Sequence, residues 1–180
     1  MSDKKIQENI TRIVIFDFDG TLVDTPMLET HGDIYHQKTG HPWPHKGWWS
    51  KRESLDMEIF DMPLIESVIA DYKSECDKSD TLLVMLTGRI PKLSEHVENI
   101  LTAKEITFDK YIYNNGGDTL TSKKASLDKL LEEFPNVKSI AMWEDRPLHV
   151  ISFRNYCDDL VKCGRIQNFD IIHVQGKHHV

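Results

Sequence analysis

The stretch Ile13-Val-Ile-Phe-Asp-Phe-Asp-Gly-Thr-Leu22 joins a short apolar run directly to two aspartates and a glycine. The run at 13–16 is β-branched and aromatic, which is typical of a strand buried in a parallel sheet. Asp17 and Asp19 follow at the point where this strand is expected to end. Residues two apart in an extended chain point to the same side, so both carboxylates are expected to face one site.

Further apolar runs at 82–86, 111–113 and 140–143 also end at polar or glycine residues, and a last strand is expected near 170–174 at a sheet edge. Between the runs, apolar residues three and four apart predict helices near 64–72, 93–101, 127–134 and 150–161. Strands that alternate with helices predict an α/β fold with a doubly wound, mainly parallel sheet and a Rossmann-like core.

The length of 180 residues fits one ordinary domain. We expect a single α/β domain over 11–180, preceded by a polar N-terminal tail over 1–10. Residues 25–63 show little periodicity and are far longer than the roughly dozen residues of a plain crossover. This segment is expected to be an insertion after the first strand that acts as a minimal cap or flap.

Composition and charge exclude several classes of protein. The chain has no apolar run of the roughly twenty residues that span a bilayer, and its start lacks the apolar core of a signal peptide, so we expect a cytoplasmic protein with no membrane partner. The net charge of -7 argues against general nucleic-acid binding. Residues 35–52 are the exception, because they carry four cations and no acid. The three cysteines match no paired motif and are expected to be reduced thiols.

The polar residues at the strand ends predict a metal site at the carboxyl edge of the sheet. Asp17 and Asp19 together with Glu144 and Asp145 offer hard oxygen ligands, which favours Mg²⁺ and leaves positions for water and a phosphate oxygen. We expect Asp145 to bind the ion directly and Glu144 to bind it directly or through water. The structural alternative is that these acids cap turns or helix N-termini.

The same segments are similar to the four motifs of the haloacid dehalogenase (HAD) superfamily. Residues 13–22 resemble the first motif and 82–87 the second, Lys123 or Lys124 before a helix resembles the third, and Glu144-Asp145 the fourth. The similarity extends over about 12–156. Gly47-Trp-Trp49, together with Thr87-Gly-Arg89 at the second motif and Glu144-Asp-Arg-Pro-Leu-His149 at the fourth, resembles the branch named for Swiss Army Knife RNA-repair-like proteins.

The resemblance implies a magnesium-dependent phosphohydrolase, a HAD-type phosphatase that works through an aspartyl-phosphate intermediate. Asp17 would be the nucleophile, and Asp19 the general acid and then the general base. The Thr87 hydroxyl and a nearby backbone N–H would bind the phosphoryl oxygens, and the adjacent Gly88 would also contact the substrate. A lysine would balance the charge that develops there. We favour Lys123 over Lys124, because leucines follow Lys123 at the spacing of an inward helix face.

The expected substrate is a phosphorylated end of RNA or DNA, bound with the help of Arg89, Trp48 and Trp49. Tryptophans among cations suit stacking on bases, but they equally suit a small core for the insertion, and Arg89 could instead pair with a nearby acid. A nucleotide-type small-molecule phosphatase is a second possibility, because the rest of the chain is acidic. A non-catalytic module that binds phosphorylated ends or a protein is a third. Among the insertion's histidines only His41 and His45 have metal-ligand spacing, so zinc is disfavoured.

Overall fold

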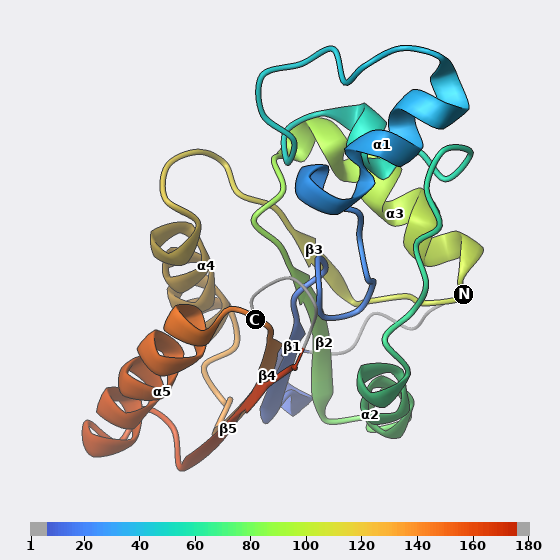
Figure 1. Cartoon of the computed structure of the whole chain (residues 1–180). Helices are drawn as coiled ribbons and strands as arrows, with labels where there is room; N and C mark the ends of the chain where they lie inside the picture. Colours follow the sequence, from blue (N-terminus) through green and yellow to red (C-terminus); the bar gives the residue numbers. More distant parts are fainter. Residues whose placement is uncertain (1–6, 176–180) are drawn as a thin grey trace.

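The computed structural model describes residues 7–175 and contains a five-stranded parallel sheet (Figure 1). The strand order is β3-β2-β1-β4-β5. The strands are β1 (Arg12–Phe16), β2 (Thr81–Leu86), β3 (Lys110–Ile112), β4 (Ser139–Glu144) and β5 (Asn168–His173). Each predicted strand is present within two residues of its expected bounds, and β5 lies at the sheet edge as predicted.

Helices cover both faces of the sheet, which confirms the predicted doubly wound α/β fold. Helices α2 (Glu66–Cys76) and α3 (Ser94–Ala103) lie on one face, and α4 (Thr119–Glu133) and α5 (Pro147–Lys162) lie on the other (Figure 1). Two short 3-10 helices, η1 (Gln7–Asn9) and η3 (Pro91–Leu93), precede β1 and α3. No helix within residues 7–175 has the length and apolar character needed to cross a membrane.

The central strand β1 explains why the sheet forms around the first apolar run. Val14 and Phe16 belong to the core on the α2 and α3 face, whereas Ile13 and Ile15 belong to the core on the α4 and α5 face. All four side chains are fully buried, and each such burial stabilises the fold by about 1.5–3 kcal/mol. Phe16 also stacks on Trp143 of β4, with ring centroids 4.5 Å apart.

The register of the strands sets the position of the site. Phe16 is paired with Met85 of β2 on one side and with Trp143 of β4 on the other. The carboxyl ends of these three strands are therefore level. The residues that follow them leave the sheet at one edge, although they are far apart in sequence.

The predicted insertion 25–63 lies between β1 and α2 and contains helix α1 (Leu28–Thr39) and the 3-10 helix η2 (Arg52–Leu55). The sequence pattern did not predict α1, because Tyr35 is its only buried residue and an apolar stripe is missing. Gly40 ends the helix with a left-handed φ of 75°. That the insertion acts as a minimal cap or flap stays a prediction. Residues 1–6 of the predicted tail lie outside the described residues, and Ile10 at its end is buried.

Candidate active site

Three acidic residues meet where β1 and β4 end. Asp17 directly follows β1, Glu144 is the last residue of β4, and Asp145 follows it. All three are buried, and each offers a carboxylate oxygen within 4.8 Å of the others. This group joins three of the four residues that the sequence predicted as metal ligands.

Lys123 of α4 lies against two of these acids. Its Nζ is 2.8 Å from Oδ2 of Asp17 and 2.7 Å from Oε2 of Glu144, and its side chain is only 2% exposed. Lys123 shares the inner face of α4 with the buried Leu127, whereas Lys124 is only half-buried. The structure therefore places Lys123, the preferred of the two lysines, in the site.

The pKa values of the acidic group reflect crowding of negative charge in a buried place. Burial, reinforced by neighbouring Glu144, raises the pKa of Asp17 to about 7 although Lys123 opposes the shift. Burial and the charges of Asp17 and Glu144 raise the pKa of Asp145 to about 8. A cation between these carboxylates would relieve the repulsion, so the residues present fit a hard divalent ion.

Glu144 has the opposite behaviour, because its partners are cationic or donate hydrogen bonds. Burial works against ionisation, but the Lys123 ammonium and the nearby His149 hold the pKa of Glu144 well below its usual range. Its Oε1 accepts a hydrogen bond from the backbone N–H of Arg146 at 3.2 Å. Lys123 in turn has its pKa raised, because Asp17 and Glu144 outweigh the effect of burial. Glu144 therefore holds Lys123 in place beside Asp17.

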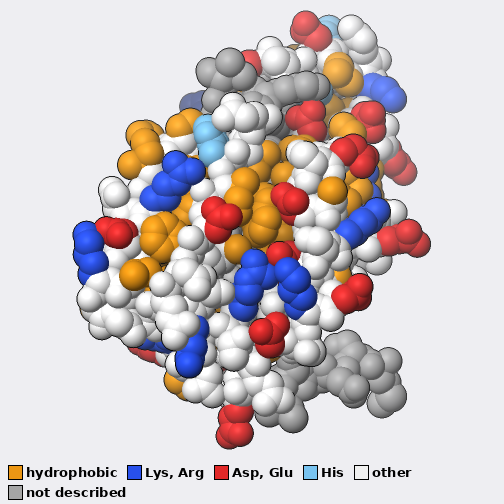
Figure 2. All heavy atoms as spheres, turned by 90° about the horizontal axis from the view of Figure 1, so that it is seen from below, with side chains coloured by type: hydrophobic (Ala, Val, Ile, Leu, Met, Phe, Trp, Pro, Cys, Tyr) orange, Lys and Arg blue, Asp and Glu red, His pale blue; other side chains and the backbone are white. Residues whose placement is uncertain are grey.

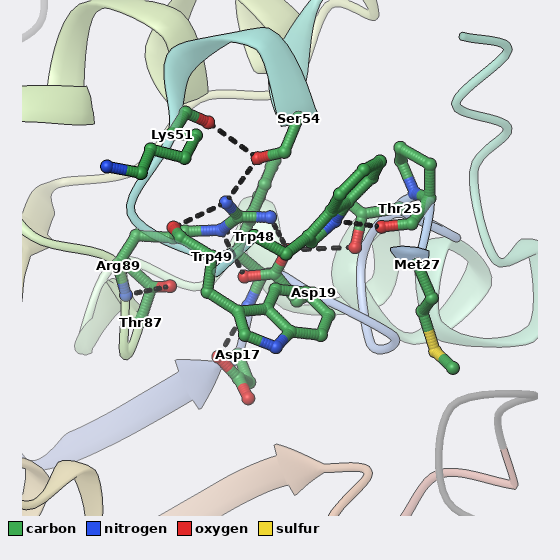
Figure 3. A network of polar contacts seen from close by, with 12 residues as sticks. Asp17, Asp19, Thr25, Met27, Trp48, Trp49, Lys51, Ser54, Thr87 and Arg89 are labelled. Atoms are coloured by element: carbon green, nitrogen blue, oxygen red, sulfur yellow. Dashed lines mark hydrogen bonds and ion pairs between the residues drawn. The ribbon is translucent and has the colours of Figure 1, made fainter. Parts of the chain in front are cut away.

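Asp19 lies in a different environment from the acidic group. The Arg89 guanidinium donates to it through Nε, 3.0 Å from Oδ2, and through Nη2, 2.7 Å from Oδ1 (Figure 3). The Thr25 hydroxyl also donates to Oδ1, at 2.8 Å. Asp19 is a carboxylate in this pairing, so it can accept a proton at once and must acquire one before it can donate. Arg89 was expected to help bind the substrate. Its pairing with Asp19 matches the alternative hypothesis, in which it pairs with a nearby acid.

Thr87 and Gly88 lie at the end of β2 as predicted. The Thr87 hydroxyl accepts a hydrogen bond from the backbone N–H of Arg89 at 3.1 Å. Gly88 faces the first turn of α4 so closely that an added Cβ would lie 2.7 Å from Cγ2 of Thr119. Sequence reasoning missed Thr119. The signal was Asp118, whose carboxylate caps α4 by accepting from the backbone N–H of Thr121 and thereby fixes where the helix begins.

The two adjacent tryptophans of the insertion have different surroundings. Trp48 is 4% exposed, packs on Trp43 with centroids 4.3 Å apart, and donates through Nε1 to the Pro26 carbonyl. Trp49 is 40% exposed, and its ring lies 5.0 Å from the Arg89 guanidinium carbon. Trp48 thus belongs to the core of the insertion, and Trp49 is the ring at the site (Figure 3).

A pocket of about 360 Å³ opens beside Asp17 and Asp19. Its lining residues are Asp17, Asp19, Trp49, Gly88, Arg89, Thr119, Lys123 and Arg146. Arg146 also lines this pocket, and its charge acts on the neighbouring Asp145, where it opposes the rise in the pKa of that acid. A larger hollow of about 510 Å³ lies between η2 and α3, but none of the predicted site residues lines it.

A family model described as HAD domain family 1 in Swiss Army Knife RNA repair proteins matches residues 37–180. The matched range contains Thr87, Lys123 and the Glu144-Asp145 pair. It begins after Asp17 and Asp19, so these two residues join the site through the geometry described above.

Individual proteins resemble the chain over most of its length. The Saccharomyces cerevisiae protein YMR265C is 27% identical over 177 residues, which cover 84% of this chain but only 38% of that protein. A haloacid dehalogenase-like hydrolase family protein, SP0104 from Streptococcus pneumoniae, has a similar structure with a TM-score of 0.52 at 16% identity. The HAD domain of the effector Lem4 from Legionella pneumophila gives 0.54 at 14% identity. Each structural match covers 94% of this chain and 88% of the other, and at these identities it concerns the fold alone.

Proposed function

Because the chain belongs to HAD domain family 1 of the Swiss Army Knife RNA repair proteins, we propose that it is a phosphatase that hydrolyses phosphate monoesters. The observation that carries the proposal is the pairing of Asp17 with Lys123 beside Glu144 and Asp145. A buried carboxylate next to a buried ammonium and two further acids suits a nucleophile that must approach a dianionic phosphate.

Mg²⁺ is the proposed cofactor. Asp17 and Asp145 would hold it, and Glu144 would contribute directly or through water, because hard carboxylate oxygens match this ion. The raised pKa values of Asp17 and Asp145 support a cation at this place. When bound, the ion would neutralise the acids and polarise a phosphoryl oxygen.

The residues of the chain divide the reaction into two steps. The Asp17 carboxylate attacks phosphorus, so that a bond from its oxygen to phosphorus forms while the ester bond breaks, and the departing alkoxide takes a proton that Asp19 has first acquired from solvent water. Asp19 then removes a proton from the water that cleaves the aspartyl-phosphate and releases inorganic phosphate. Lys123 stabilises the charge on the phosphoryl oxygens in both steps.

A phosphorylated end of RNA or DNA is the proposed substrate. The exposed ring of Trp49 offers a surface on which a terminal base can stack. Arg146 offers a cation for a second phosphate of the same strand. The cations Lys38, Lys46, Lys51 and Arg52 belong to the same insertion as Trp49 and would bind the phosphates of nucleotides further along the strand.

A nucleotide-type small molecule is the second candidate substrate. The pocket volume of about 360 Å³ suits a small ligand, and the chain has a net charge of -7. On the face away from the insertion, the acidic and basic side chains of the described residues are interspersed (Figure 2). A long polyanion would find its cations in the insertion, whereas a mononucleotide needs the pocket alone.

The catalytic proposal is tested with p-nitrophenyl phosphate and Mg²⁺. Hydrolysis is expected for the wild type, is expected to stop with EDTA, and is expected to fall at least 10³-fold in Asp17→Asn. Asp33→Asn, an exposed aspartate of α1, is the matched control and should keep full activity. Activity that survives in Asp17→Asn would contradict the assigned nucleophile. An inactive wild type that still binds phosphorylated oligonucleotides would support the non-catalytic module.

The substrate is tested by comparing 3'- and 5'-phosphorylated oligonucleotides with mononucleotides. A polynucleotide enzyme should prefer an oligomer and lose that preference as salt rises, because released counterions drive such binding. Arg146→Met should raise KM for substrates with a second phosphate and leave it unchanged for those with one. If the enzyme hydrolyses oligonucleotides and mononucleotides equally well at every salt concentration, the result would favour the small-molecule function.

A further inference from the structure

Arg89 connects the proposed acid–base residue with the insertion. Its side chain is 1% exposed, and one side of its guanidinium grips the Asp19 carboxylate. The other side, at Nη1, donates to the Trp49 carbonyl at 2.7 Å and to the Ser54 hydroxyl at 2.8 Å (Figure 3). Asp19 follows β1 and Arg89 follows β2, but Trp49 and Ser54 both belong to the insertion. The contacts therefore span three separate segments of the chain.

Ser54 is oriented so that its oxygen can accept from Arg89. The residue is fully buried in η2, and its hydroxyl donates to the Lys51 carbonyl at 2.7 Å. The backbone N–H of Ser54 donates to the same carbonyl at 3.1 Å, which holds the turn closed. Because its single hydroxyl proton is used toward Lys51, the lone pairs of the oxygen face the guanidinium.

We propose that Ser54 and the Trp49 carbonyl are positioning groups of the catalytic site, which act through Arg89 to fix the Asp19 carboxylate. The inference rests on the proposed function, since it takes Asp19 as the general acid and base. It gives the insertion a part in the chemistry in addition to any role as a cover. Ser54 is the insertion residue that positions Arg89 through its side chain, and the sequence pattern did not identify it.

The geometry of a guanidinium explains how the effect travels. Its five N–H donors lie in one rigid plane, so the two insertion acceptors at Nη1 fix the direction of Nε and Nη2 toward Asp19. Without the Ser54 oxygen, one of the two buried N–H groups of Nη1 loses its acceptor while the other still donates to the Trp49 carbonyl. A rotation that finds a new acceptor for the orphaned N–H turns the guanidinium out of the plane that Asp19 needs. The Thr25 hydroxyl holds Oδ1 of Asp19 but leaves the orientation of Arg89 undetermined.

Substrates with different leaving groups separate a positioning role from a merely structural one. The p-nitrophenolate leaving group departs without a proton, whereas the alkoxide of a nucleoside monophosphate has to be protonated by Asp19. Misplacing Asp19 should therefore lower kcat/KM for the nucleoside monophosphate more than for p-nitrophenyl phosphate. A loss of folded protein would lower both values by the same factor.

The experiment compares Ser54→Ala with Ser50→Ala, an exposed serine of the same segment. Ser54→Ala is expected to lower kcat/KM about tenfold for the nucleoside monophosphate and less than threefold for p-nitrophenyl phosphate, because a misplaced acid loses part of its roughly 10²–10⁴-fold contribution. Ser50→Ala should match the wild type on both substrates. Ser54→Cys, which keeps the side-chain shape with a weaker acceptor, should show the same selectivity if Ser54→Ala fails to fold. Arg89→Lys should show it more strongly, because an ammonium lacks the planar fork.

Equal losses on the two substrates, or no loss in a folded Ser54→Ala protein, would overturn the proposal. Failure of the proposed function gives a different result, since the wild type would then be inactive or Asp17→Asn would stay active. Hydrolysis that needs Asp17 together with an unselective Ser54→Ala variant would remove the positioning role alone.

Discussion

The Lys123 ammonium lies 2.8 Å from the Asp17 carboxylate, so the buried cation of α4 is paired with the aspartate that follows β1. Glu144 accepts from the same ammonium at 2.7 Å. The removal of one partner from such a group leaves an uncompensated buried charge, which is far more costly than the loss of a surface ion pair. Lys123 therefore stabilises the fold and serves the site at once.

Lys123→Met should show both effects. We expect at least a 100-fold loss of phosphatase activity, because the phosphoryl charge loses its counter-ion, and a fall of about 3–5 kcal/mol in the free energy of unfolding. Lys124→Met is the matched control, and we expect less than a twofold change in activity and about 0.5 kcal/mol or less in stability. Urea unfolding and p-nitrophenyl phosphate hydrolysis measure the two effects. The reverse pattern would assign the phosphate-binding lysine to position 124.

Metal removal should make stability depend on pH in a specified direction. Asp17 and Asp145 have raised pKa values of about 7 and about 8 in the fold, against 3.8 for the free side chain. The folded protein therefore holds protons that the unfolded chain has lost. In EDTA, the free energy of unfolding should fall as pH rises from about 4 to 8, by up to about 1.4 kcal/mol per pH unit for each group. The stabilising contribution is present in full below pH 3.8 and is lost above pH 8.

Mg²⁺ should reverse this loss, because the ion binds the deprotonated carboxylates. The increase in Tm on adding Mg²⁺ should be large at pH 8 and close to zero at pH 5.5, and thermal unfolding in paired EDTA and Mg²⁺ samples measures it. Asp145→Asn should reduce the pH dependence in EDTA as well as the response to Mg²⁺. A response to Mg²⁺ of the same size at every pH would place the ion away from these acids.

Most of the acidic site was predictable from the sequence, because it depends on strand ends. Apolar runs ending at Asp17, Thr87 and Glu144 are local signals, and a parallel sheet brings such ends to one edge by its topology. The choice of Lys123 over Lys124 was also predictable, since helix periodicity decides which of two adjacent residues faces inward.

The part of the site supplied by the insertion was not predictable in the same way. The contact between Arg89 and Ser54 joins residues 35 positions apart through an irregular segment, where neither a period of two nor a period of 3.6 applies. For the same reason, the sequence pattern did not predict helix α1 and could not distinguish the roles of Trp48 and Trp49. Which of the two rings is buried depends on the side of a tight turn from which each ring projects, and tertiary packing decides this.

The two tryptophans provide a matched pair of variants. Trp48→Ala should lower the free energy of unfolding by about 3–5 kcal/mol, because it removes the centre of the insertion core. Trp49→Ala should cost about 1 kcal/mol or less, but it should raise KM about fivefold or more for nucleotides through loss of stacking. KM for glycerol phosphate, which carries no ring, should change little. Equal KM increases for both substrates would argue against a stacking role of Trp49.

Gly88 and Thr119 should behave as a coupled pair. In Gly88→Ala the new Cβ would lie 2.7 Å from Cγ2 of Thr119, so the first turn of α4 has to shift relative to the end of β2. Lys123 lies one turn further along α4, and we expect kcat/KM to fall about tenfold or more, because even a small displacement disturbs the reacting geometry. Gly32→Ala, whose Cβ meets only Leu28 at an ordinary 3.5 Å, is the control and should keep full activity.

Thr119→Ser removes Cγ2 and keeps the hydroxyl, so it should restore much of the activity lost in Gly88→Ala. A double-mutant cycle on kcat/KM, with thermal unfolding to verify folding, measures this coupling. Rescue would locate the defect in the contact between the β2 end and α4. Purely additive losses in the double variant would mean that Gly88 is needed for its own backbone, as expected if its N–H binds a phosphoryl oxygen directly.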